Sequence, residues 1–153
     1  MPPPPHRVLA LGLALASPAI SQSLEMIDGT DQFAFVEVAG RFGEARLDRG
    51  RDNPVVVGTM NGVNYGLFLM GCDPACSSVQ FYATWRGARI GPDRINEWNR
   101  MSRFAKAYLN VRGTPTLEMD VNIDGGVTRA NFIDTFELWR VLSTGFARNV
   151  IGG

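Results

Sequence analysis

The sequence predicts an α+β domain, in which helices pack on an antiparallel sheet of about five strands, in the order α-β-β-β-α-β-β-α. Two apolar runs, 55–60 and 63–70, flank Asn61-Gly62, which is a strong short-range signal for a β-hairpin. Segments 79–85 and 116–121 alternate apolar and polar residues with the period of a half-buried strand. Large apolar residues near the end of the chain recur at steps of three and four, as on one face of a long helix.

The elements follow from local patterns. Asp31 is suited to cap a first helix over 31–41, and 44–48 reads as a short edge strand. Pro92 suits the first position of a short second helix, which is followed by an alternating strand over 104–110. Thr128 is suited to cap the final helix, which runs from 129 to about 149 and should be the main core element. Its apolar stripe comprises Phe132, Phe136, Trp139, Leu142, Phe146 and Val150.

Residues 1–21 have the layout of a secretory signal peptide. An uncharged apolar run at 8–16 follows His6 and Arg7, and small residues stand at Ala19 and Ser21. The run is shorter than the roughly 20 residues that span a bilayer, although a retained anchor is the alternative. We therefore expect a periplasmic or secreted protein with a single domain over 31–150 and no stable membrane insertion after cleavage.

Charge and histidine content limit the chemistry. After removal of residues 1–21, fourteen basic and fifteen acidic residues remain, a net charge of −1. This argues against a nucleic-acid binder, which normally carries a basic footprint. Cleavage also removes His6, the only histidine, so histidine-based nucleophile activation and metal sites are excluded. We expect no cofactor and no catalytic residues.

Several short sequence motifs carry a family resemblance. The most specific are Asn-Glu-Trp-Asn at 96–99 and Asp-Val-Asn-Ile-Asp-Gly-Gly at 120–126, joined by Gly71-Cys72, by Val-Gln-Phe at 79–81 and by Phe-Ala-Lys-Ala-Tyr at 104–108. With these motifs, the chain resembles the YbjN-like domain family over residues 31–149. That family is described as "putative bacterial sensory transduction regulators". The resemblance implies a fold like that of type III secretion chaperones, which usually dimerise and bind other proteins, and it implies no catalytic residues.

Cys72 and Cys76, the only cysteines, lie in one predicted loop. In an oxidising compartment such a pair predicts a disulfide, worth about 2 kcal/mol in the chain-entropy model. Two free thiols and a redox-active pair are the alternatives, although the Cys-x-x-x-Cys spacing differs from the thioredoxin type.

Asp120, Asn122 and Asp124 match the first half of a calcium-binding loop. The second half fails, because Asn131 stands at position twelve, where a bidentate glutamate is required. We interpret the segment instead as a strand end and a tight turn, with Gly125 and Gly126 at positive φ, and predict no metal.

A basic stretch is the candidate partner-binding site. Segment 86–106 has a net charge of +4 and segment 24–52 a net charge of −3, and the simplest interpretation is two solvated faces. The sharper hypothesis is a partner or self-association surface made by the second helix, with Trp98 either at its centre or in the core. Its residues would be Arg94, Trp98, Arg100 and Arg103.

Glu118 and Asp120 share one face of a predicted strand. Paired acids are able to perform general acid–base catalysis, but we expect these two to line the solvent side of the sheet.

The sequence thus favours an exported, non-enzymatic protein-interaction module, a homodimer with a regulatory or chaperone-like role and an unknown protein partner. The alternatives are an envelope enzyme that uses carboxylates without histidine and a structural envelope stress protein with no specific ligand. Residue patterns do not decide whether the ligand is protein, lipid or glycan.

Overall fold

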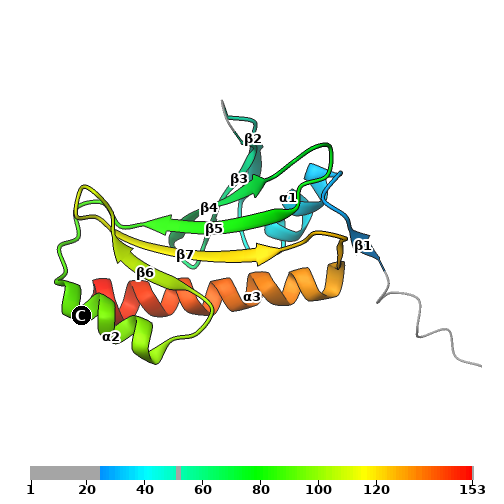
Figure 1. The fold of residues 1–153 in the computed structure, drawn as a ribbon. Coiled ribbons are helices and arrows are strands. Elements are labelled where there is room, and N and C mark those ends of the chain that lie inside the picture. The colour runs from blue at the N-terminus through cyan, green and yellow to red at the C-terminus, as the bar shows by residue number, and fades with distance from the viewer. Residues whose placement is uncertain (1–24, 51–52, 153) are drawn as a thin grey trace, which may run out of the picture.

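The computed structural model describes residues 25–50 and 53–152, and the predicted signal peptide lies outside them. Its main feature is a six-stranded antiparallel sheet in the order β2-β3-β4-β5-β7-β6 (Figure 1). The strands are β2 (Ala45–Asp48), β3 (Val55–Met60), β4 (Val63–Met70), β5 (Ser78–Thr84), β6 (Lys106–Leu109) and β7 (Pro115–Asn122). The α+β prediction is confirmed, with six strands in this sheet where about five were predicted.

In the described part of the chain, four helical segments accompany the sheet: α1 (Gln32–Gly40), α2 (Pro92–Met101), α3 (Arg129–Phe146) and the π-helical turn η2 (Ala147–Ile151). The capping predictions are confirmed. The Asp31 carboxylate accepts a hydrogen bond from Phe33 N at 2.9 Å, and Thr128 Oγ1 accepts one from Asn131 N at 3.1 Å. No helix in the described part of the chain is long and apolar enough to cross a membrane.

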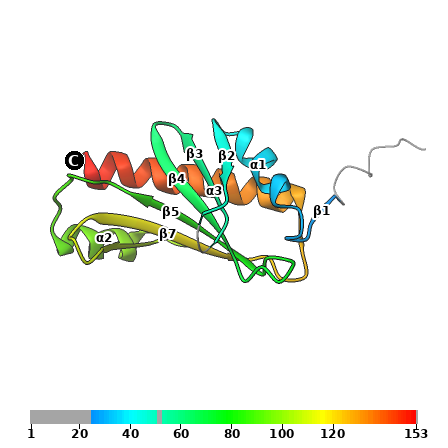
Figure 2. The same ribbon diagram turned by 90° about the horizontal axis from the view of Figure 1, so that it is seen from above.

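Helix α3 runs along one face of the sheet (Figures 1 and 2). In the described residues it supplies four of the six fully buried aromatic side chains, namely Phe132, Phe136, Trp139 and Phe146. Phe136, which is fully buried, has its ring centroid 4.9 Å from that of Phe81 on β5 and 5.4 Å from that of Phe132. Helix α1 packs on α3 through an edge-to-face pair of Phe35 and Phe132, with centroids 5.3 Å apart. The predicted aromatic stripe therefore forms the centre of the core.

Three element predictions need correction. The segment before α1, for which no strand was predicted, contains β1 (Met26–Ile27), which pairs with β8 (Val127–Thr128) in a second small sheet. The strand predicted over 104–110 begins only at Lys106, because Phe104 has a φ of 73° and turns the chain before β6. The final α-helix ends at Phe146, and the chain continues as η2 to Ile151.

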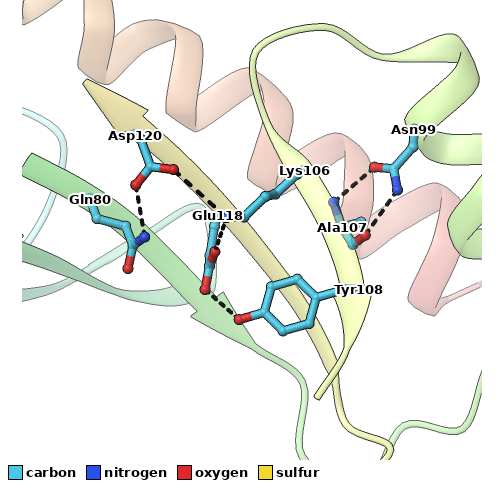
Figure 3. A network of polar contacts seen from close by, with 7 residues as sticks. All are labelled: Gln80, Asn99, Lys106, Ala107, Tyr108, Glu118 and Asp120. Atoms are coloured by element: carbon cyan, nitrogen blue, oxygen red, sulfur yellow. Dashed lines mark hydrogen bonds and ion pairs between the residues drawn. The ribbon is translucent and has the colours of Figure 1, made fainter. Parts of the chain in front are cut away.

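Helix α2 closes the outer edge of β6. The Asn99 side chain accepts a hydrogen bond from Ala107 N at 2.8 Å and donates one to Ala107 O at 2.9 Å (Figure 3). The two outward backbone groups of this edge residue are thus satisfied by a carboxamide in place of another strand. This contact gives a structural reason for Asn99 in the Asn-Glu-Trp-Asn motif.

Candidate functional site: the open face of the sheet

The sheet has one face in the core and one face turned away from it. The core takes alternate residues of each strand, such as Val56, Leu67, Phe81 and Leu117. The intervening residues form the other face, here called the open face, and strand register arranges them in two rows. Row one is Arg46, Val57, Gly66, Tyr82, Glu118 and Lys106; row two is Asp48, Val55, Phe68, Gln80 and Asp120.

A polar cluster occupies the β5–β7–β6 end of the open face (Figure 3). Lys106 Nζ lies 2.9 Å from Glu118 Oε2, and the Tyr108 hydroxyl donates a hydrogen bond to the other carboxylate oxygen. Gln80 Nε2 donates to Asp120 Oδ1 at 2.8 Å. The Glu118 side chain is only 9% exposed, so the expectation that it lines the solvent side needs correction: it lies on the outward face but is covered by its partners.

The protonation states of Lys106 and Tyr108 argue against either of these two groups acting as a general base. Hydrogen bonding to Glu118 raises the pKa of Lys106 above its ordinary value. Burial raises the pKa of Tyr108, and the Glu118 hydrogen bond raises it further. Both groups therefore remain protonated near neutral pH, and neither is able to accept a proton from a substrate there. The arrangement is that of a satisfied surface network.

The middle of the open face is aromatic and apolar. Phe68 on β4 and Tyr82 on β5 form an edge-to-face pair with centroids 5.9 Å apart, and Val55 and Val57 continue this surface onto β3. These four side chains are half-buried. Charged residues stand at both margins, with Arg46 and Asp48 on β2 and with Lys106 and Asp120 on β6 and β7.

A groove of about 580 Å³ runs beside the aromatic centre. It is lined by residues of β2, β3, β4 and β5, and it includes two residues without side chains, Gly58 and Gly66. Thr59 Oγ1 donates to Asn64 Oδ1 at 2.7 Å on its wall. The groove is thus both polar and apolar, and no histidine or cysteine is among the described residues that line it.

Tyr65 borders the groove from the core side and gives a pH prediction. Burial raises its pKa from 10.0 to about 12, so the folded state holds the proton more tightly than the unfolded state does. This contribution is fully present below pH 10 and is lost as the pH rises from about 10 to about 12, by roughly 2–3 kcal/mol. Urea titrations across this range should show the wild type losing stability relative to Tyr65→Phe as the pH rises. Lys106 and Tyr108 titrate in both proteins, so their contribution cancels from this comparison. Parallel curves of stability against pH for the two proteins would therefore contradict the prediction.

The structure separates the four predicted partner-binding residues. Arg94 Nη2 donates to Asn149 O at 2.5 Å, and the half-buried Trp98 packs edge-on against Phe146 with centroids 5.1 Å apart. These two side chains therefore tie α2 to the C-terminal helix, which agrees with the core alternative for Trp98. Arg94, Arg100 and Arg103 are all exposed, but Arg94 is bonded to the C-terminal segment, which leaves Arg100 and Arg103 as the exposed candidates without such a contact in the described residues.

The other sequence candidates have structural positions. Cys72 and Cys76 form the disulfide predicted for the loop between β4 and β5. Gly125 and Gly126 have positive φ, as predicted for a tight turn.

The side chains of the calcium-loop candidates have other partners. Asn122 Oδ1 accepts from Asp124 N at 2.9 Å, and Asp120 is turned toward Gln80 and Lys106. In residues 25–50 and 53–152, no group of three or more His, Cys, Asp or Glu side chains is placed to hold a metal ion.

Fold and site together define a small α+β domain with one sheet face buried under helices and the other offering an aromatic centre with charged margins. The chain belongs to the YbjN family, whose description is "putative bacterial sensory transduction regulator" and whose model matches residues 35–151. No curated protein and no solved structure matches significantly, so the likeness to type III secretion chaperones stays a prediction.

Proposed function

We propose that this chain is an exported, non-enzymatic regulatory module that acts through protein–protein contact, and that its open face binds a second copy of the chain. The observation that carries the proposal is the half-buried aromatic and aliphatic centre of that face, bordered by charges. Apolar centres with polar rims are the usual anatomy of protein interfaces. The family description supports a regulatory role.

The two rows are complementary to each other under a two-fold axis. Consider an axis that lies parallel to the sheet, runs across the strands and passes between row one and row two. It places row one of one copy over row two of the other. Arg46 then faces Asp48 of the partner subunit, and Glu118 faces Asp120 of the partner subunit, with Lys106 on the adjacent strand as the cation beside this pair of carboxylates. Such an isologous contact stacks two sheets with their strands aligned, which is a common packing geometry.

The same axis determines which side chains meet at the centre of the contact. The axis brings Phe68 over Gly66 of the partner subunit, which is flanked by Val55 and Phe68 of its own chain, so the Phe68 rings of the two copies would meet there. The groove beside Gly66 leaves room for adjustment. Aromatic residues at the centre contribute most of the affinity of such contacts. The exposed charges at the margins contribute little energy, but they select the register.

The histidine-free enzyme is the second candidate, and the open face offers it little. Its most buried carboxylate, Glu118, is already bonded to Lys106 and Tyr108, and both partners hold their protons at neutral pH. A chaperone-like role remains compatible with the open face, since it also requires only a protein-binding surface.

The test is Phe68→Arg in sedimentation equilibrium. We expect the wild type to have twice the mass of one chain, and we expect the variant to be monomeric. The change places an uncompensated charge at the centre twice per dimer, so the dissociation constant should rise roughly a hundredfold or more. A wild type that stays monomeric at its highest accessible concentration, or a variant that dimerises as well as the wild type does, would refute self-association through this face.

Phe33→Arg is the matched control, because Phe33 is 58% exposed on α1, away from the open face. It should leave the mass unchanged. Crosslinking in the native envelope followed by mass spectrometry addresses the regulatory partner. Recovery of a second protein crosslinked to this chain would support the regulatory role, and turnover of a small substrate by the purified protein would instead favour the enzyme.

A further inference from the structure

The connection between α2 and β6 exposes a compact basic and apolar corner, defined here as residues 100–104. Met101 is 76% exposed and Phe104 is 64% exposed, although both are large apolar side chains. Arg100 precedes Met101 and Arg103 precedes Phe104, and neither arginine has a carboxylate within ion-pair distance in the described residues. Figure 1 shows this connection at the bottom edge of the molecule.

The backbone holds the corner in a fixed conformation. Ser102 N donates to Trp98 O at 2.8 Å, and Ala105 N donates to Arg103 O at 2.9 Å. Phe104 has a φ of 73°, a left-handed conformation that bulky residues rarely adopt. The guanidinium carbon of Arg103 lies 4.9 Å from the centre of the Phe104 ring. The chain thus accepts backbone strain at a position where an aromatic ring and a cation are presented to solvent together.

We propose that this corner docks the protein on the surface of an anionic lipid bilayer. Phe104 and Met101 would enter the boundary between headgroups and acyl chains, and the two guanidinium groups would bind lipid phosphates. This is surface binding, which needs no membrane-spanning segment.

The size of the corner favours a bilayer over a protein partner. A specific protein interface buries about 800 Å² on each side and uses some 20–30 residues. Five residues at a turn supply a small part of that area. A bilayer surface accepts a few inserted side chains with adjacent cations, and each cation near an anionic surface contributes about 1 kcal/mol, a factor of about five in partitioning.

The test is co-sedimentation with vesicles of phosphatidylcholine containing about a third phosphatidylglycerol. We expect wild-type binding that high salt abolishes. Phe104→Gly should weaken partitioning about tenfold and keep the fold, because glycine adopts this φ without strain. The Arg100→Gln/Arg103→Gln double variant should weaken partitioning roughly thirtyfold. Phe33→Ser removes a similarly exposed ring from α1 and should change nothing.

Three results would overturn the proposal. The first is a failure of the wild type to sediment with these vesicles. The second is binding of Phe104→Gly to the vesicles as strong as that of the wild type. The third is capture by polyglutamate without vesicle binding, which would assign the corner to an acidic protein surface. The thermal transition of Phe104→Gly, measured in parallel, should lie within a few degrees of the wild-type value.

Discussion

Phe136→Ala is expected to lower the free energy of unfolding by about 4 kcal/mol. Phe136 is fully buried and lies against four aromatic rings, at centroid distances from 4.9 to 6.2 Å, which belong to Phe42, Tyr65, Phe81 and Phe132. These rings come from β4, β5, α3 and the turn after α1, so truncation leaves a cavity where the elements meet. A domain of this size has a total stability of about 5–15 kcal/mol, and urea titration should show a large shift of the midpoint.

Two variants calibrate this result. Phe136→Leu keeps most of the volume and should lower the stability by roughly 1–1.5 kcal/mol. Val141→Ala changes a residue on the same helix that is 54% exposed, and it should stay within about 0.5 kcal/mol of wild type. Equal shifts for Phe136→Ala and Val141→Ala would mean that α3 does not pack on the sheet as described.

Gly29→Ala is expected to lower the free energy of unfolding by about 3 kcal/mol or more. A Cβ atom at Gly29 would lie 2.3 Å from Cys76 O and 2.9 Å from Cys76 N, and both are backbone atoms that are unable to rotate away. Cys76 N also donates a hydrogen bond to Gly29 O at 3.0 Å. The substitution must therefore separate the segment after β1 from the disulfide loop.

Gly125→Ala is the matched control for Gly29→Ala. Gly125 has nearly the same φ, +77° against +82°, but a Cβ atom there would meet no atom within 4 Å in the described residues. It should show only the cost of the left-handed conformation, about 1 kcal/mol. The difference between the two variants, measured by thermal or urea unfolding, isolates the close approach. If the two were equally destabilised, the segment after β1 would not be docked on the loop.

The elements that the sequence predicts well are those whose signal is local. The stripe from Phe132 to Val150 has helical spacing over five turns, and Asn61-Gly62 specifies its own hairpin. The capping roles of Asp31 and Thr128 could be predicted because a cap involves only the next two or three residues. These interactions are complete within a short segment, so they are visible without knowledge of the fold.

Features that depend on strand register were missed. Glu118 looks like an exposed alternate residue of β7, and it is covered only because β6 places Lys106 and Tyr108 beside it. The pairing of β1 with β8 joins two-residue strands about a hundred positions apart, too short to give an alternating pattern. The contact of Trp98 with Phe146 likewise depends on how α2 crosses the end of α3, and periodicity alone left its two interpretations open.

The carboxamide of Asn99 has a consequence for aggregation. A sheet with two free edges is able to add strands without limit, which is the route to fibrils. In the six-stranded sheet, one edge is blocked by a side chain bonded to both backbone groups of Ala107, so in the described residues the β2 edge is the one left for strand addition to this sheet. Growth by edge pairing through β2 therefore ends at two copies and does not propagate into a filament.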